Sequence, residues 1–243
     1  MSNEFLIKGI NIAMLPSDYG STGFKMFKGS ILNNVEIAYE TWGDLSINKD
    51  NVILLFTGLS PSSHAASSVE NKDKGWWEYM IGPNKPIDTN KYYVVCVNSL
   101  GSCFGSTSPA SINKNSNSVY GLSFPELSIE DIAKAGHNAL QTLGIDHVHT
   151  VIGPSMGGMT ALAYALLFPS SLTNLIVISA AARALPFTIS IRSLQRELIR
   201  SDPLWNKGNY NKKTAPLNGM KLARKLGLMS YRAANEWRER FNR

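Results

Sequence analysis

The stretch Val151-Ile-Gly-Pro-Ser-Met-Gly-Gly-Met159 decides how the rest of this sequence is interpreted. It contains the pattern G-x-S-x-G with Ser155 at its centre, between an apolar run typical of a strand and an Ala/Leu-rich run typical of a helix. Small residues two positions before and after the serine relieve crowding in a sharp strand-to-helix turn. The serine then lies at the helix N-terminus, where the helix dipole favours developing negative charge. We therefore predict that Ser155 is a nucleophile.

Two other interpretations of this turn compete with the nucleophile. A glycine-rich turn can serve packing alone, and some glycine-rich turns before helices bind phosphate. A phosphate-binding loop would carry a lysine directly after the glycines, where this sequence has Met159. The flanking strand and helix patterns favour the nucleophile.

A serine that transfers acyl groups needs two hydrogen-bond donors for the oxyanion. One donor is expected to be the N–H of Met156, the residue after the serine, and the other should come from a loop after an earlier strand. The loop TGLSP at residues 57–61 follows the apolar run at residues 52–56, and ligands of α/β sheets bind at the carboxyl ends of such strands. We predict that the N–H of Leu59 is the second donor.

Strand and helix patterns alternate along the chain, which predicts an α/β fold with a mainly parallel sheet. Residues 35–41 alternate apolar and polar side chains and are expected to form a strand on a partly exposed sheet. Further strands are expected at residues 52–56, 92–97, 150–152 and 175–179, and helices at residues 129–143 and 156–168. Ser128 with Asp131 three residues later predicts the N-cap of the first helix.

Length and composition restrict the class of protein. A chain of 243 residues with 44% hydrophobic and 17% charged residues can bury a substantial core as a single domain. The composition excludes collagen-like, coiled-coil and disordered chains, and no apolar run is long enough for a membrane span. The N-terminus lacks the pattern of a secretory signal, and Cys96 and Cys103 are too few for a disulfide framework. We expect a cytoplasmic protein.

The formal net charge of +6 arises mainly from the segment after Ser190. No helix-turn-helix, zinc or RNA-binding pattern accompanies these basic residues, so we expect no nucleic-acid partner. Arg192, Arg196 and Arg200 follow one another at i, i+4 spacing, which is also typical of a solvated helix face. An anionic small molecule is a third explanation for the excess of positive charge.

The positions of the histidines disagree with the expected catalytic order, in which an acid and then a histidine follow the serine. The four histidines are His64, His137, His147 and His149, and all of them precede Ser155. His147 and His149 begin the strand that leads to the serine, so they are expected at the opposite end of the sheet. We interpret His64 as a loop or pocket residue, and the chain as the N-terminal part of a longer enzyme.

Several stretches together resemble the homoserine O-acyltransferase family of α/β-hydrolase-fold enzymes, and most closely its serine O-succinyltransferase branch. They extend from about residue 35 to the end of the chain and are much more specific than G-x-S-x-G alone. The stretches are AYETWG (38–43), TGLSP (57–61), HAA (64–66), GWWE (75–78), VNSLGSC (97–103), GST (105–107), FPELSIED (124–131), the turn around Ser155, ALPF (184–187), SLQRE (193–197) and KLAR (221–224).

The resemblance implies an α/β-hydrolase fold, with helices on both faces of a mainly parallel sheet. It implies a single, incomplete domain over residues 1–243, in which residues 184–243 begin a helical lid and the C-terminal part is missing. It places Ser155 at the nucleophile and the N–H groups of Leu59 and Met156 at the oxyanion hole. It also implies that the loop Gly58, Leu59, Ser60 and Pro61 influences specificity, and that Arg224 and Tyr231 contact substrate.

The implied reaction is acyl transfer through an acyl-serine intermediate. Succinyl-CoA or acetyl-CoA is the expected co-substrate, L-serine or L-homoserine the acceptor, and neither a cofactor nor a metal is expected. A planar guanidinium such as that of Arg224 can hold the carboxylate of an amino acid bidentately, although a solvated arginine on a basic helix has the same pattern. A homodimer is expected for the complete protein, with no membrane partner.

Three features depart from the family pattern. The catalytic acid and histidine are absent from this chain, Phe104 replaces a residue that is often polar or basic, and Ser108 stands where glycine is common. The first departure leaves two alternatives open beside the acyltransferase. One is a non-catalytic fragment or pseudoenzyme, and the other is an esterase on the same fold.

Overall fold

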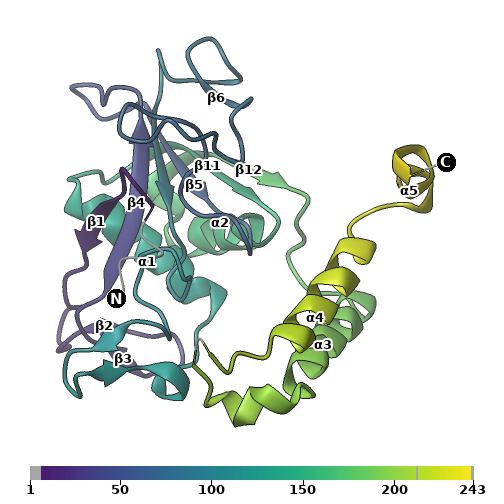
Figure 1. The fold of residues 1–243 in the computed structure, drawn as a ribbon. Coiled ribbons are helices and arrows are strands. Elements are labelled where there is room, and N and C mark those ends of the chain that lie inside the picture. Colours follow the sequence, from purple (N-terminus) through teal and green to yellow (C-terminus); the bar gives the residue numbers. More distant parts are fainter. Residues whose placement is uncertain (1–6, 212, 242–243) are drawn as a thin grey trace. The chain divides into compact units, whose positions relative to one another are not determined.

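The computed structural model describes residues 7–211 and 213–241, and these residues form two compact units (Figure 1). The first, called the sheet unit here, ends at Ala182, and the second, called the helical unit, begins at Arg183. The assignment of residues 184–243 to the lid of a single domain stays a prediction.

A six-stranded sheet with the strand order β1-β4-β8-β5-β11-β12 lies at the centre of the sheet unit. Strands β8, β5, β11 and β12 are parallel, whereas β4 is antiparallel to both β1 and β8. The prediction of a mainly parallel sheet is confirmed. The strands are β1 (Asn11–Met14), β4 (Glu36–Trp42), β5 (Val52–Phe56), β8 (Tyr93–Val97), β11 (Val148–Pro154) and β12 (Leu172–Ile178).

Strand β1 was not expected from the sequence. It has four residues, of which only Ala13 is buried, so it carries too little alternation to reveal a strand. The described chain also contains three short strand pairs and short 3-10 turns around the sheet. These are β2 (Phe24–Lys25) with β3 (Ile31–Leu32), β6 (Ile81–Gly82) with β7 (Ile87–Asp88), β9 (Ile112–Asn113) with β10 (Ser118–Val119), η2 (Gly121–Ser123) and η3 (Pro169–Ser171).

Side chains of β5 alternate between two cores because successive residues of a strand point to opposite faces. Val52, Leu54 and Phe56 join a core that includes buried residues of α1 (Ile129–Thr142) and α2 (Met156–Leu167). All five residues of β5 are buried, as the continuous apolar run predicts.

Ile53 and Leu55 of β5 belong to the core on the other face of the sheet. This core is completed by Trp42 and by the segment between β5 and β8, including Trp76 and Trp77. Helices were expected on both faces. In the described part of the sheet unit, both α1 and α2 contribute to the first core, and an irregular segment with short strands covers the second.

Strand β4 is more buried than its alternating sequence predicts, with four of its seven residues buried and three half-buried. It lies between β1 and β8, and Ile37 and Trp42 contribute to opposite cores. The polar residue Glu40 is only 2% exposed, on the same face as Trp42. Its carboxylate is buried because it has hydrogen-bond partners, which sequence alternation cannot reveal.

Helix α1 begins with the capping box that the sequence predicts. The Ser128 hydroxyl accepts the N–H of Asp131 at 3.2 Å, and the Asp131 carboxylate accepts the N–H of Ser128 at 2.9 Å. The other oxygen of Asp131 accepts the N–H of Phe27 at 2.6 Å. This side chain therefore connects the helix start to a distant loop.

The helical unit contains α3 (Pro186–Arg200), η4 (Pro203–Gly208), α4 (Leu217–Ser230) and α5 (Ala234–Phe241), with α3 and α4 side by side (Figure 1). Gly219, Ala223 and Gly227 are the buried residues of α4. A β-carbon on Gly219 would lie 2.9 Å from the Cα of Ile199, so the small side chains permit close helix packing. Among the described residues, no helix has the length and apolar character needed to cross a membrane.

Candidate active site

Ser155 occupies the turn between β11 and α2, at a strained backbone conformation. Its φ of 55° and ψ of −120° lie outside the common regions for residues with a side chain. The N–H of Ser155 donates to the carbonyl of Ile178, the last residue of β12, at 2.9 Å. The neighbouring strand therefore holds the turn, and the Ser155 side chain remains exposed at the carboxyl end of the sheet.

Glycines around Ser155 are required by close backbone contacts. A β-carbon on Gly153 would overlap the carbonyl of Gly157, and one on Gly157 would lie 2.8 Å from the carbonyl oxygen of Thr57. A β-carbon on Gly158 would lie 2.6 Å from the β-carbon of Ala180. Gly153 and Gly157 therefore allow the sharp turn and Gly158 allows close packing, as the sequence pattern predicts.

The two predicted oxyanion donors lie on adjoining segments. Met156 is the first residue of α2, and its N–H has no acceptor within the part of the chain that the structure describes. The N–H of Leu59 likewise has no acceptor among the described residues. A β-carbon on Gly58 would be 3.6 Å from the carbonyl oxygen of Pro154, so the loop of Leu59 passes beside the turn of Ser155.

The predicted specificity loop, residues 58–61, presents side chains of contrasting exposure. Gly58 is buried and Pro61 is half-buried, whereas Leu59 and Ser60 are exposed. The loop follows the buried Thr57 at the end of β5 and precedes the buried Ser63 and His64. Both of its ends are therefore anchored in the protein interior.

Three of the four histidines have partners unrelated to Ser155. His147 contacts Thr173 and the carbonyl of Ser170, and His149 contacts Thr150. His147 directly precedes β11, so it is roughly 25 Å along the strand from Ser155 at about 3.3 Å per residue. His137 contacts the Tyr164 hydroxyl at 3.2 Å, and burial lowers its pKa.

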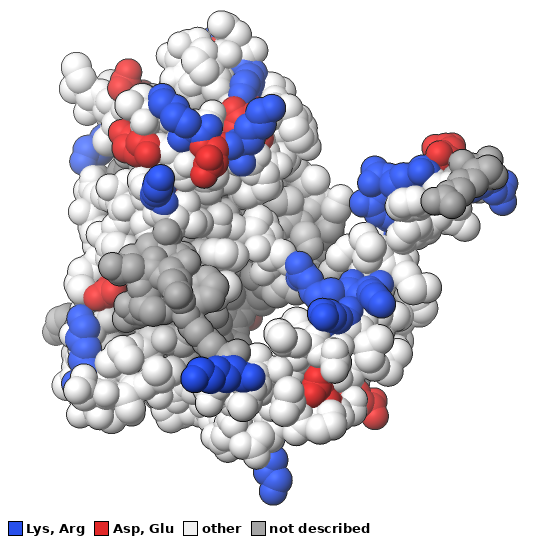
Figure 2. Space-filling model, in the orientation of Figure 1, with Lys and Arg blue, Asp and Glu red and all other residues white. Residues whose placement is uncertain are grey.

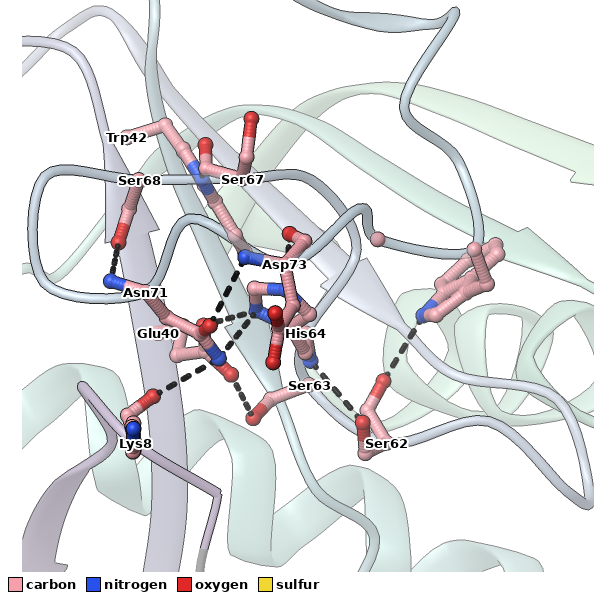
Figure 3. Close-up of polar contacts among 12 residues, drawn as sticks. Lys8, Glu40, Trp42, Ser62, Ser63, His64, Ser67, Ser68, Asn71 and Asp73 are labelled. Atoms are coloured by element: carbon pink, nitrogen blue, oxygen red, sulfur yellow. Dashed lines mark hydrogen bonds and ion pairs between the residues drawn. The ribbon is translucent and has the colours of Figure 1, made fainter.

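The remaining histidine, His64, uses both ring nitrogens for structural contacts. Nδ1 lies 2.8 Å from the Glu40 carboxylate, and Nε2 lies 2.8 Å from the carbonyl oxygen of Asp73 (Figure 3). Burial alone would lower the pKa of His64, but the hydrogen bonds to Glu40 and Asp73 and the charges of both acids outweigh it and raise the pKa. With both nitrogens engaged, His64 has no free position for a proton from Ser155.

Arg224 and Tyr231 both belong to the helical unit. Arg224 lies on α4, and Tyr231 is the C-cap residue of that helix, seven positions later. Residues seven positions apart are about two turns apart, so both project from the same side of the helix. Arg224 and Tyr231 are exposed.

Arg192 on α3 positions Tyr231, a role that the sequence analysis missed. Its Nη1 donates to the Tyr231 hydroxyl at 3.2 Å and to Gln195 Oε1 at 2.8 Å. The guanidinium of Arg192 also lies 5.6 Å from the centre of the Tyr231 ring. The i, i+4 spacing of arginines on α3 gave no sign of this contact because the partner comes from another helix.

Charge is unevenly distributed over the surface. Figure 2 shows Lys and Arg side chains over α4 and α5 of the helical unit. Within residues 7–211 and 213–241, no three His, Cys, Asp or Glu side chains are grouped as metal ligands. The described site in the sheet unit therefore consists of a serine and main-chain donors.

The fold and this site define an α/β protein with a serine on a strained strand-to-helix turn. The chain belongs to the alpha/beta hydrolase fold family, which matches residues 51–243.

The sequence similarity to relatives with named activities extends far beyond the G-x-S-x-G pattern. The chain is 58% identical over 219 residues to a serine O-succinyltransferase of Litchfieldella anticariensis, covering 90% of this chain and 60% of that relative. It is 52% identical over 240 residues to a serine O-succinyltransferase of Xanthomonas axonopodis pv. citri, covering 99% of this chain and 59% of that relative. The chain thus spans about 60% of the length of these curated relatives.

Solved structures of proteins with two different activities share the fold of this chain. Homoserine O-acetyltransferase from Bacillus anthracis is 29% identical, with a TM-score of 0.87 over 98% of this chain and 64% of the other. Esterase E22 is 32% identical, with a TM-score of 0.86 over 97% of this chain and 65% of the other. The same arrangement therefore occurs in a transferase and in an esterase.

Proposed function

We propose that this chain carries the nucleophile of an acyl-CoA-dependent O-acyltransferase, which moves a succinyl or acetyl group to the hydroxyl of L-serine or L-homoserine. The observation that carries the proposal is 58% identity over 219 residues to a serine O-succinyltransferase. The exposed Ser155 on its strained turn supports the same reaction.

In the first half-reaction, the Ser155 oxygen attacks the thioester carbonyl carbon of acyl-CoA. The oxyanion of the tetrahedral intermediate accepts hydrogen bonds from the N–H groups of Leu59 and Met156. The C–S bond then breaks, and CoA leaves as a thiol with the proton that came from the Ser155 hydroxyl. The acyl group stays on Ser155 as an ester.

In the second half-reaction, the acceptor hydroxyl attacks this ester. The bond between Ser155 and the acyl carbon breaks, and the acceptor proton returns to the Ser155 oxygen through a general base. Arg224 holds the acceptor carboxylate with two parallel hydrogen bonds, and the exposed Tyr231 completes the acceptor contact. The basic helical unit attracts the anionic CoA donor.

The four histidines do not supply the general base in this proposal. His64 is engaged at both ring nitrogens, and His147 precedes the first residue of β11 while Ser155 follows its last. General-base assistance is typically worth a factor of about 10²–10⁴ in rate. We therefore expect residues 1–243 alone to show little or no turnover.

An esterase is the second candidate, because the structure of esterase E22 matches this chain with a TM-score of 0.86. Water would then replace the amino-acid hydroxyl in the second half-reaction. An esterase has no need for a guanidinium that binds the acceptor carboxylate. The two candidates therefore differ in their dependence on an amino acid.

The test compares residues 1–243 with a chimera, in which the part of the Litchfieldella relative beyond the matched segment is fused to this chain. Release of CoA from succinyl-CoA or acetyl-CoA is measured with and without L-serine or L-homoserine, and the O-acyl amino acid is identified by mass. Acceptor-dependent product from the chimera supports the transferase. Equal hydrolysis of the acyl donor or of a simple ester without any amino acid would favour the esterase.

The cellular setting and the assembly belong to the same proposal. Cys96 and Cys103 are free thiols, which fits a reducing cytoplasm. We propose a homodimer for the active protein. Its mass in solution, measured by light scattering on the chimera, tests the oligomeric state.

A further inference from the structure

The carboxylate of Glu40 and the ring of His64 form a buried pair, and His64 lies shortly after the loop of Leu59 in the chain (Figure 3). Their side chains are 3% and 10% exposed, and Oε2 of Glu40 lies 2.8 Å from Nδ1 of His64. Glu40 lies on β4, between β1 and β8 in the sheet, directly opposite Cys96 of β8. Glu40 thus comes from a strand of the sheet, and His64 comes from the segment that connects β5 to β8.

The acceptors around His64 determine its protonation. Nε2 faces the main-chain carbonyl oxygen of Asp73, which can only accept, so Nε2 carries a proton. Nδ1 faces the Glu40 carboxylate, which accepts a hydrogen bond when ionised. When Glu40 is ionised, a ring that satisfies both acceptors is an imidazolium, and the two side chains then form a buried ion pair.

The same carboxylate also binds the residue before His64. The Ser63 hydroxyl donates to Oε1 of Glu40 at 3.0 Å and accepts from Nδ2 of Asn98 at 2.9 Å. The N–H of Ser63 donates to Oδ1 of Asn98 at 2.6 Å. Asn98 directly follows β8, and Glu40 lies on β4. Residues 63 and 64 are therefore attached by hydrogen bonds to two strands of the sheet.

The loop that carries the predicted oxyanion donor is pinned at both ends. Thr57, which is 2% exposed, directly follows the buried strand β5 on one side, and Ser63, which is 0% exposed, begins the polar cluster on the other. Residues 58–62 bridge these points, and only Leu59 and Ser60 among them are exposed. Because the loop is so short, movement of residues 63 and 64 would change the direction of the Leu59 N–H.

We propose that the Glu40–His64 pair is a positioning element, which holds the loop of residues 58–62 so that the N–H of Leu59 points at the oxyanion formed at Ser155. This inference rests on the proposed function, since it assigns the Leu59 N–H to that oxyanion. Glu40 and His64 do not touch the reacting atoms and act only through the loop.

The pair predicts a dependence on pH. The groups that face it are the carboxylate and carbonyl of Asp73, the amide of Asn71, whose Nδ2 is 3.4 Å from Nδ1 of His64, and the thiol of Cys96 beside Glu40. Burial and the charge of Glu40 raise the pKa of the Cys96 thiol, which therefore stays neutral. The pKa of His64 is raised in the folded protein. The contribution of the pair to the stability of the folded protein is therefore complete below the ordinary histidine pKa and is lost as pH rises through the raised value.

The first measurement is nuclear magnetic resonance on residues 1–243, which needs no turnover. In the wild-type chain at pH 7, both ring nitrogens of His64 should carry protons, and the backbone order parameter of Leu59 should be near the rigid value of about 0.85. In Glu40→Gln, the His64 titration should move to lower pH and the Leu59 order parameter should fall below about 0.6. The Leu59 methyl signal should shift with the same midpoint as His64 in both proteins.

Two further variants separate positioning from a general loss of folding. His137→Gln removes a half-buried histidine outside this cluster and should leave the Leu59 signals unchanged. Ser63→Ala removes only the hydroxyl between Glu40 and Asn98, and should lower the Leu59 order parameter by less than is expected for Glu40→Gln. It provides the test if Glu40→Gln fails to fold. Order parameters of α1 serve as the internal reference in every variant.

Two results would overturn the inference. One is a neutral His64 ring at pH 7 in the wild-type chain, and the other is an unchanged Leu59 order parameter in folded Glu40→Gln. Failure of the proposed function has a different signature, because a chimera without acceptor-dependent turnover would leave these resonance results intact.

Discussion

The backbone of Gly157 passes so close to Gly153 that a β-carbon on Gly153 would overlap the Gly157 carbonyl oxygen. This contact closes the turn that exposes Ser155. Neither backbone segment can retreat easily, since a β-carbon on Gly157 would meet the end of β5 on its other side.

Gly153→Ala should therefore destabilise the protein by more than about 3 kcal/mol, because an overpacked backbone contact must move the strand or the helix. Gly58→Ala is the matched control, since its β-carbon would meet its nearest neighbours at 3.6 Å, an ordinary contact. It should change the free energy of unfolding by less than about 1 kcal/mol. Urea denaturation of both variants checks this, and equal stability of the two would contradict the close contact.

Substitutions of Ser155 should separate chemistry from strain. Ser155→Ala should abolish the acyl-enzyme and leave the unfolding free energy nearly unchanged, because alanine suffers the same positive φ of 55°. Ser155→Gly should be more stable than Ser155→Ala by about 1–2 kcal/mol, because glycine adopts this conformation without strain.

The measurements for Ser155 are denaturation curves on residues 1–243 and the mass of trapped acyl-enzyme in the chimera. Acyl groups found on another residue of Ser155→Ala would refute the nucleophile assignment. A glycine variant no more stable than the alanine variant would refute the strain.

Arg224→Lys should impair use of the acceptor more than formation of the acyl-enzyme. Lysine cannot make the bidentate contact, whose loss costs about 1.5–3 kcal/mol, or roughly tenfold to a hundredfold in kcat/KM for the amino acid. Arg200→Lys, the same change at another exposed arginine of the helical unit, is the control. Equal losses in the acylation burst and in acceptor turnover of the chimera would instead assign Arg224 to CoA binding.

Glu78 should contribute to acid stability. Its carboxylate accepts the N–H groups of Ser67 at 2.7 Å and Gly75 at 3.1 Å, and the hydroxyl of Ser67 at 2.9 Å. The N–H of Ser67 is the largest cause that lowers the pKa of Glu78 to about 2. A lowered carboxyl pKa stabilises the fold above the unfolded value of 4.5, and this contribution is lost as pH falls towards about 2.

Glu78→Gln should therefore lower stability at pH 7 and flatten its decline between pH 5 and pH 3, relative to the wild-type chain. Glu126→Gln is the control, because Glu126 is a surface partner of Lys28 and accepts no backbone N–H in the described structure. Unfolding free energies across this pH range are the measurement. Parallel curves for wild type and Glu78→Gln would show that Glu78 has an ordinary pKa.

Local sequence determined the elements whose contacts are close in the chain. The capping box of Ser128 and Asp131 needs only residues three positions apart, and Gly153 meets the carbonyl of Gly157 only four positions later. Continuous apolar runs likewise predicted β5 and β8, because strands covered on both faces need no polar side. The family resemblance, carried by strings along the whole chain, pointed to the same fold.

Tertiary structure alone decided the partners of isolated polar residues. Glu40 belongs to an alternating strand that predicts exposure, yet it is buried because His64 and Ser63, more than 20 positions later, neutralise and hydrogen-bond its carboxylate. Arg192 is part of a regular arginine spacing, yet it holds Tyr231 from a neighbouring helix. Periodicity reports which face a residue occupies, whereas hydrogen-bond partners depend on which distant segments fold against that face.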